Sequence, residues 1–204
     1  MPEKHLLNTS LLLPIVYLGS ITYYSALLDA PATILEKHEH FIKQTYRNRC
    51  LIAGPNGKQM LVIPVEKGKT GHSPVKDVRI CYNSAWQKIH WRSLEAGYRR
   101  SPYFEFYEDD LHGLYEEKEK FLVDFNLKLH EKIMKWLKEE KTLAFTGSYE
   151  KVYAEIRDCR NGWKEEDAKE YIQVFSARNG FIQGLSVVDL IFNEGPRSIS
   201  YLKG

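Results

Sequence analysis

Residues 41–65, FIKQTYRNRCLIAGPNGKQMLVIPV, decide the predicted architecture because they encode a β-hairpin. The turn is the sequence PNG at residues 55–57, since Pro fixes φ and both Asn and Gly tolerate positive φ. Apolar runs at residues 50–52 and 60–65 flank this turn, which favours two antiparallel strands. Pro64 has no amide hydrogen to donate, so we expect it at a strand end, an edge or a bulge.

The strand period of two divides residues 41–52 into two faces. One face carries three cations between apolar ends: Lys43, Arg47 and Arg49. The other carries neutral hydrogen-bonding groups: Gln44, Tyr46 and Asn48. Two interpretations stay open. The segment is either a two-sided polar strand whose cations guard a sheet edge, or a strand that crosses a polar pocket where Arg47 or Arg49 binds an anion.

The length and composition fit a single globular domain. The chain has 204 residues, of which 43% are hydrophobic and 13% aromatic, so it can form one well-packed core. We expect one domain over residues 1–204, with a sheet-forming part at about 1–82 and a mainly helical part at about 83–204. The net charge of +2 gives no general electrostatic case for binding nucleic acid or an anionic membrane.

The cysteines and the N-terminus indicate a cytoplasmic protein. The three cysteines are odd in number, far apart and without a CxxC motif, so they form neither a disulfide framework nor a zinc ribbon. The N-terminal run LLNTSLLLPIVYL is interrupted and too short to span a bilayer, so no integral membrane segment is predicted. The oligomeric state stays open.

The first 35 residues predict a β-α-β unit. Residues 11–17 read as a buried strand, residues 20–28 as a helix capped by Ser20, and residues 32–35 as a second strand. Such a crossover favours a parallel pair. The turn at residues 18–20 would then lie at the carboxyl end of the first strand, where open α/β sheets bind ligands.

The sequence contains few patterns that indicate a metal or cofactor site. His38 and His40 share a face, but no third metal ligand stands at a diagnostic spacing. The loop sequence GKTGHSP lacks the spacing of a Walker motif. We therefore predict neither a metal site nor a cofactor, and we read residues 75–82 as a further strand.

The second half predicts mainly helices. Residues 86–99 form a helix with His90 on or beside its packed face, either as a satisfied core histidine or as a general acid/base. The longest helix spans residues 114–138, followed by a short strand or connector at 142–146, a weak helix at 149–157 and a charged turn at 157–160. The predicted fold class is α/β, with α+β as the alternative: a mixed β-sheet covered by C-terminal helices.

The C-terminal tail predicts a capped helix with two unexplained residues. Ser186 is the N-cap, Asp189 takes the third position of a capping box, and Gly195 ends the helix. Asn193 and Glu194 lie near the helix C-terminus, where a negative charge opposes the macrodipole. We therefore expect Glu194 to have a specific partner, Arg47 or Arg49.

Five blocks of this sequence resemble the WbqC-like family, in that family's order: LPIVYLGSITYYSALL, YRNRCLI, MLVIPV, HWRSLEAGYRRSPYFEFY and GFIQGLSVVDLIFNEGP. The family's opening block often reads QPxYFPYLGY. The usual Gln is absent here, so any role of that Gln does not carry over. Members of the family occur in bacterial surface-polysaccharide clusters, including O-antigen clusters.

The resemblance implies a role in O-antigen-type (lipopolysaccharide) biosynthesis, as a transferase that modifies an amino sugar or nucleotide-linked sugar. In that role His90 would be the base, and a single pocket beside residues 18–19 would hold the substrate through Gln44, Tyr46, Arg47, Asn48, Arg49, Asn193 and Glu194. The alternative is a non-catalytic partner or scaffold in a glycan-assembly pathway.

Overall fold

The computed structural model describes residues 10–66, 73–162 and 168–203. Its first unit is a β-α-β crossover, as the sequence predicts. Strand β1 (Ser10–Pro14) leads through helix α1 (Ile21–Asp29) to strand β2 (Thr33–Glu36), and the two strands pair in parallel with Leu11 opposite Thr33. The Ser20 side chain caps α1 by accepting a hydrogen bond from the backbone N–H of Tyr23.

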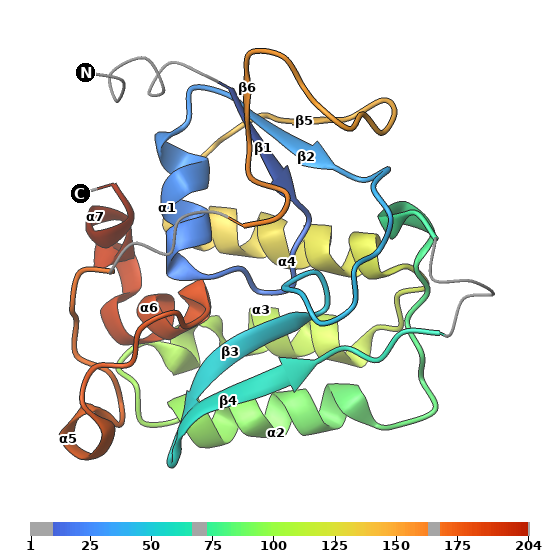
Figure 1. Ribbon diagram of the computed structural model, residues 1–204. Coiled ribbons are helices and arrows are strands. Elements are labelled where there is room, and N and C mark those ends of the chain that lie inside the picture. The colour runs from blue at the N-terminus through green and yellow to red at the C-terminus, as the bar shows by residue number, and fades with distance from the viewer. Residues whose placement is uncertain (1–9, 67–72, 163–167, 204) are drawn as a thin grey trace.

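The parallel sheet has four strands in the order β5-β2-β1-β6 (Figure 1). Strands β5 (Leu143–Phe145) and β6 (Ile156–Asp158) flank the first pair, and both run parallel to their neighbours. Half of this sheet therefore comes from beyond residue 82. The mainly helical part expected at about 83–204 thus contains α2 to α7 and also contributes two strands to this sheet.

The predicted hairpin is present, formed by β3 (Arg49–Gly54) and β4 (Gly57–Val62) around the predicted turn. It is a separate two-stranded sheet, so the expected single mixed sheet is corrected to a parallel sheet plus a hairpin. Backbone hydrogen bonds position the hairpin: Tyr17 N–H, after β1, donates to the carbonyl of Tyr46, before β3, and Ser186 N–H donates to the carbonyl of Leu51 in β3. The α/β class itself is confirmed.

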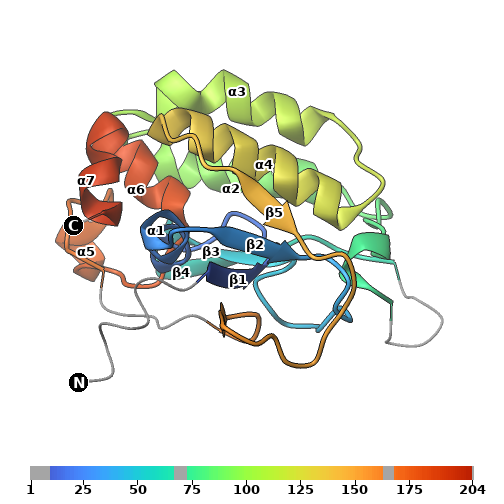
Figure 2. The ribbon, with the colours of Figure 1, turned by 90° about the horizontal axis from the view of Figure 1, so that it is seen from above.

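Seven helices and two 3-10 turns complete the described chain. Their bounds are α1 as above, η2 (Val75–Asp77), α2 (Trp86–Tyr98), α3 (Phe104–Glu116), α4 (Leu122–Leu137), α5 (Ser176–Asn179), α6 (Val187–Glu194), η3 (Gly195–Arg197) and α7 (Ser198–Leu202). Figure 2 shows α3 and α4 as a layer on one side of the strands, with α6 and α7 at one end. The apolar core lies between these layers.

Four expected elements differ from the structure, two of them because backbone groups pair across the chain. The expected strand at residues 75–82 is η2 followed by isolated bridges, of which Arg79 pairs with Phe121. This pairing also splits the expected 114–138 helix, since Ile80 N–H donates to the Lys120 carbonyl and Leu122 N–H to that of Val78. Residues 149–157 contain no helix, and residues 41–48 are turns rather than strand.

Candidate ligand cavity at the edge of the parallel sheet

A cavity of about 530 Å³ lies at the carboxyl ends of β1 and β6. Strand β1 lies between β2 and β6, and all three run parallel, so their carboxyl ends meet at the same edge of the sheet. Open parallel sheets bind ligands in the crevice at such an edge. The lining residues are Pro14, Val16, Ile42, Gln44, Thr45, Tyr46, Arg47, Arg49, Cys50, Leu51, Met60, Arg160, Asn161 and Gly162. We call this space the sheet-edge cavity.

Arg47 reaches this cavity but is held by internal partners. It is 3% exposed, and its Nε donates to Glu39 Oε1 at 2.8 Å. Its other guanidinium nitrogens donate to Thr45 Oγ1 at 3.2 Å and to the Arg160 carbonyl at 3.1 Å. Burial raises the pKa of Glu39, and the Arg47 charge opposes that rise. Arg47 therefore supports the wall of the cavity, and the carboxylate of Glu39 balances its charge.

Arg160 is a second paired cation in the lining. Its guanidinium binds Asp158 at 2.5 Å and approaches Glu36 at 3.4 Å, and it donates to the carbonyl of Glu150 at 2.9 Å. The Asp158 hydrogen bonds keep the pKa of that carboxyl below its usual value. The sequence shows this group only as a charged turn, and nothing in its spacing indicates that it would close a cavity.

Arg49 is the cation of the lining with capacity left for a ligand. Its Nε is buried and has no hydrogen-bond partner among the described residues. Among the described residues, its guanidinium makes one side-chain hydrogen bond, a long one from Nη1 to Met60 Sδ at 3.8 Å. Because an unsatisfied buried donor is costly, this guanidinium is suited to an anionic acceptor.

The remaining lining combines neutral and apolar groups. Gln44 is exposed at the rim with a φ of 64°, and Tyr46 and Asn161 add further polar groups. Cys50 also belongs to the lining, but it is buried, and burial raises the pKa of its thiol well above the usual value. A neutral, buried thiol is a poor nucleophile, so Cys50 serves as packing.

The structure brings together four of the eight sequence-predicted site residues: Gln44, Tyr46, Arg47 and Arg49. The other four lie elsewhere. The Asn48 side chain donates to the Ile63 carbonyl at 2.8 Å, and that of Asn193 to the Asp189 carbonyl at 2.7 Å. Glu194 pairs with Arg197 at 2.9 Å, so its partner is neither Arg47 nor Arg49.

His90 lies inside the core on α2. It is 3% exposed, and its Nδ1 is 2.9 Å from the hydroxyl of Tyr17, which also hydrogen bonds to that of Tyr115. Burial lowers the pKa of His90 to about 4, partly offset by a hydrogen bond with the backbone of Val62. His90 is therefore neutral near pH 7. It is absent from the described lining of the sheet-edge cavity, and it orients Tyr17 and Tyr115.

Comparison with known protein families matches the part of the chain that forms the sheet-edge cavity. The WbqC-like protein family matches residues 16–179, most of the chain. The chain belongs to the WbqC-like family. The matched range contains the hairpin and nearly all of the cavity lining, whereas α6 with Asn193 and Glu194 lies outside it.

One curated relative is Rv1507c of Mycobacterium tuberculosis, an uncharacterised protein. It is 25% identical over 212 residues, which cover 89% of this chain and 91% of the relative. No solved structure matches this WbqC-like chain. Within the described residues, no helix is both long and apolar enough to cross a membrane.

Proposed function

We propose that this WbqC-like protein binds an anionic sugar derivative, a nucleotide-linked amino sugar, in the sheet-edge cavity. We further propose that it acts as a transferase in cytoplasmic steps of O-antigen-type surface-polysaccharide biosynthesis. The observation that carries the binding proposal is the Nε of Arg49, which has no hydrogen-bond partner among the described residues and lies by the carboxyl edge of a parallel sheet. The surface-polysaccharide setting of WbqC-like proteins supports the pathway, and the three unpaired thiols support a reducing compartment.

The dimensions and chemistry of the cavity suit such a ligand. Its volume of about 530 Å³ falls within the range of about 300–1,000 Å³ that is usual for small-molecule sites. Arg49 would hold a phosphate through charge-assisted hydrogen bonds, while Gln44 and Tyr46 would face sugar hydroxyls. The apolar groups of Leu51 and Met60 would contact the less polar face of the ligand.

A second candidate function is a sugar-binding partner that performs no chemistry. One observation favours it. Among the lining residues that the structure describes there is no carboxylate and no imidazole, and the Cys50 thiol is held neutral by burial. A transfer reaction in this cavity would need a proton acceptor, and Tyr17 behind Cys50 does not supply one, because it is completely buried and burial raises its pKa well above the usual value.

The test of binding is calorimetric titration of the full chain with UDP-N-acetylglucosamine and other nucleotide sugars. Arg49→Gln should weaken binding by about tenfold or more, since one charge-assisted hydrogen bond contributes about 1.5–3 kcal/mol. Lys43→Gln is the matched control, because Lys43 is exposed and outside the lining. If no nucleotide sugar binds the wild type, or if both variants bind equally, the binding proposal fails.

The test of chemistry follows the product by mass spectrometry when an acyl donor is added with the bound amino sugar. Tight sugar binding without any product would replace the transferase by the non-catalytic partner.

A further inference from the structure

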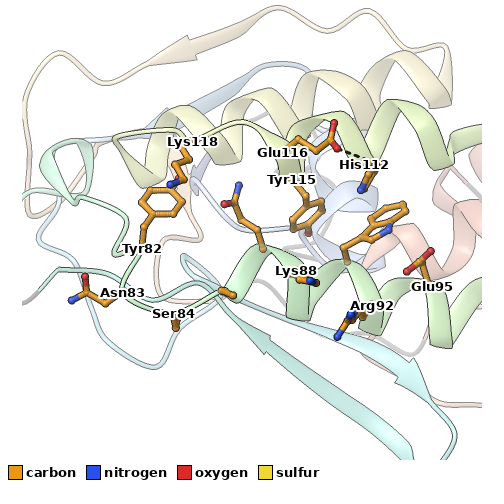
Figure 3. Close-up of a pocket in the computed structure, with 13 residues that line it drawn as sticks. Tyr82, Asn83, Ser84, Lys88, Arg92, Glu95, His112, Tyr115, Glu116 and Lys118 are labelled. Atoms are coloured by element: carbon orange, nitrogen blue, oxygen red, sulfur yellow. Dashed lines mark ion pairs between the residues drawn. The ribbon is translucent and has the colours of Figure 1, made fainter.

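A groove of about 650 Å³ lies between the first half of α2 and the end of α3, lined by residues that the sheet-edge cavity does not use (Figure 3). The lining residues are Tyr82, Asn83, Ser84, Ala85, Gln87, Lys88, Trp91, Arg92, Glu95, His112, Tyr115, Glu116 and Lys118. Part of the HWRSLEAGY block forms one wall of this space. We call it the helix groove.

The helix groove has an excess of unmatched positive charge. Of its two carboxylates, Glu95 pairs with Arg99 at 2.8 Å. Glu116 lies 3.9 Å from Nδ1 of His112, the pair dashed in Figure 3, which is too far for a hydrogen bond, so the charge of Glu116 remains in the groove beside the cations. The cations have no carboxylate partner among the residues that the structure describes: Lys88, Arg92 and Lys118. Three unpaired cations around one concavity favour an anion.

The start of α2 adds hydrogen-bond donors to the same space. The N-cap of this 13-residue helix is Ala85, which provides no side-chain cap, so the first backbone N–H groups lack the usual acceptor. Asn83 and Ser84 line the groove directly before it. Uncapped helix N-termini bind phosphate well, and here the cations stand beside one.

Aromatic side chains also line the helix groove. The Nζ of Lys118 lies 5.6 Å from the centre of the Tyr82 ring, and the two are seen together in Figure 3. The rings of His112 and Trp91 lie with their centres 4.5 Å apart and their planes tilted by 45°. A flat ring attached to the anion would therefore have aromatic surface to contact.

We propose that the helix groove binds a phosphate ester that carries a ring, either a nucleotide or a sugar phosphate. The hydrogen-bonded core of Tyr17, His90 and Tyr115 separates this groove from the sheet-edge cavity, since Tyr115 lines the groove while Tyr17 is fully buried behind Cys50. A ligand here cannot present an atom to one bound beside Arg49. The groove is thus an anchoring or effector site, and it stands whether or not the sheet-edge cavity binds a sugar.

The experiment titrates the full chain carrying Arg49→Gln, so that the sheet-edge cavity contributes least. The probes are inorganic pyrophosphate, uridine diphosphate and glucose 1-phosphate, followed by calorimetry at low salt. Adding Lys88→Gln and Arg92→Gln together should weaken binding by about tenfold or more, because two charge-assisted contacts are lost. Adding salt should also weaken it. Arg100→Gln, an exposed cation beyond the end of α2, is the matched control.

Each result decides a part of the proposal. Tightest binding of uridine diphosphate identifies the ligand as a nucleotide, and tightest binding of glucose 1-phosphate identifies it as a sugar phosphate. Equal binding of inorganic pyrophosphate overturns the ring contact. Absence of binding, or binding that the double substitution leaves intact, overturns the site. Because all measurements carry Arg49→Gln, these outcomes are independent of the sugar-binding proposal.

Discussion

Arg47 and Arg49 are two residues apart, yet the structure gives them different roles. Arg47 is enclosed by Glu39, Thr45 and the Arg160 carbonyl, whereas the Nε of Arg49 has no partner among the described residues. The difference arises because residues 41–48 turn instead of extending, which removes the expected common face. Of the two arginines, Arg47 therefore supports the wall of the cavity, and Arg49 is the candidate for binding an anion.

Replacing Arg47 should cost stability. Arg47→Ala leaves Glu39 buried without its cation, and the loss of one partner of a buried ion pair usually costs about 3–5 kcal/mol. Urea unfolding followed by circular dichroism should show this loss, while Lys43→Ala should remain close to the wild type. An Arg47→Ala protein of unchanged stability would show that the ion pair between Arg47 and Glu39 does not stabilise the fold.

Asp189 is a second residue whose surroundings correct its sequence interpretation. It was expected in a capping box, but it is completely buried and accepts hydrogen bonds from the Tyr171 hydroxyl at 2.5 Å and from Gln173 at 3.1 Å. Ser186 still caps α6, as predicted. Burial raises the pKa of Asp189 to about 6, and the hydrogen bonds from Tyr171, Tyr98 and Gln173 limit that rise. Through these hydrogen bonds, Asp189 holds residues 171–173 against α6.

At the scale of elements, the approach of α2 to the hairpin depends on one glycine. A Cβ on Gly97 would lie 2.7 Å from the backbone oxygen of Ala53 in β3. The same contact region contains the hydrogen bond from Ala53 N–H to the Tyr98 hydroxyl at 3.0 Å. The hairpin therefore packs directly on the helix backbone.

Gly97→Ala should push α2 away from β3 and lower the free energy of unfolding by about 1–3 kcal/mol, the usual cost of overpacking. Gly113→Ala in α3 is the matched control, because nothing lies within 4 Å of its added Cβ. That variant should gain up to about 1 kcal/mol from helix propensity. The order of the two thermal midpoints checks the prediction, and a Gly97→Ala midpoint at or above that of Gly113→Ala would contradict it.

At the scale of the molecule, two buried histidines connect the parallel sheet unit to the helical layer. His90 of α2 bonds Tyr17, which follows β1, and Nδ1 of His130 in α4 lies 3.1 Å from the hydroxyl of Tyr24 in α1. With the backbone hydrogen bonds that position the hairpin, these contacts join parts that are distant in sequence. We therefore propose that residues 1–204 form one cooperative domain.

Acid should weaken this connection. Burial lowers the pKa of both His90 and His130 from 6.5 to about 4. Between these values the unfolded chain binds protons that the folded chain does not, so their contribution to stability is lost as pH falls from about 6.5 to about 4. The loss is up to about 3 kcal/mol per histidine, since one pKa unit corresponds to about 1.4 kcal/mol.

Urea unfolding at a series of pH values measures this loss, with His130→Gln as the test variant. The stability difference between the wild type and His130→Gln should shrink on acidification across this window. Asp189 acts in the opposite sense, because its raised pKa makes stability fall as pH rises between about 4 and 6. That effect is common to both proteins and cancels in the difference. A constant difference would show that His130 does not titrate with unfolding.

The sequence by itself determined the features that local signals encode. The β-α-β start, the hairpin turn, helix α2 and the Ser186 cap follow from apolar periodicity, turn residues and capping residues, which act within a few positions. It also indicated four residues of the sheet-edge cavity, because an unusual row of polar groups was visible in residues 44–49.

Only the tertiary structure decided which of those polar side chains have a partner within the protein. Lys120 pairs with Ile80 and so breaks a helix, Arg160 closes a cavity that begins at β1, and Asp189 receives Tyr171. Each depends on a partner brought close by folding, and the free energy of burying a polar or charged group is set by that partner. A pattern confined to neighbouring residues contains no information about it.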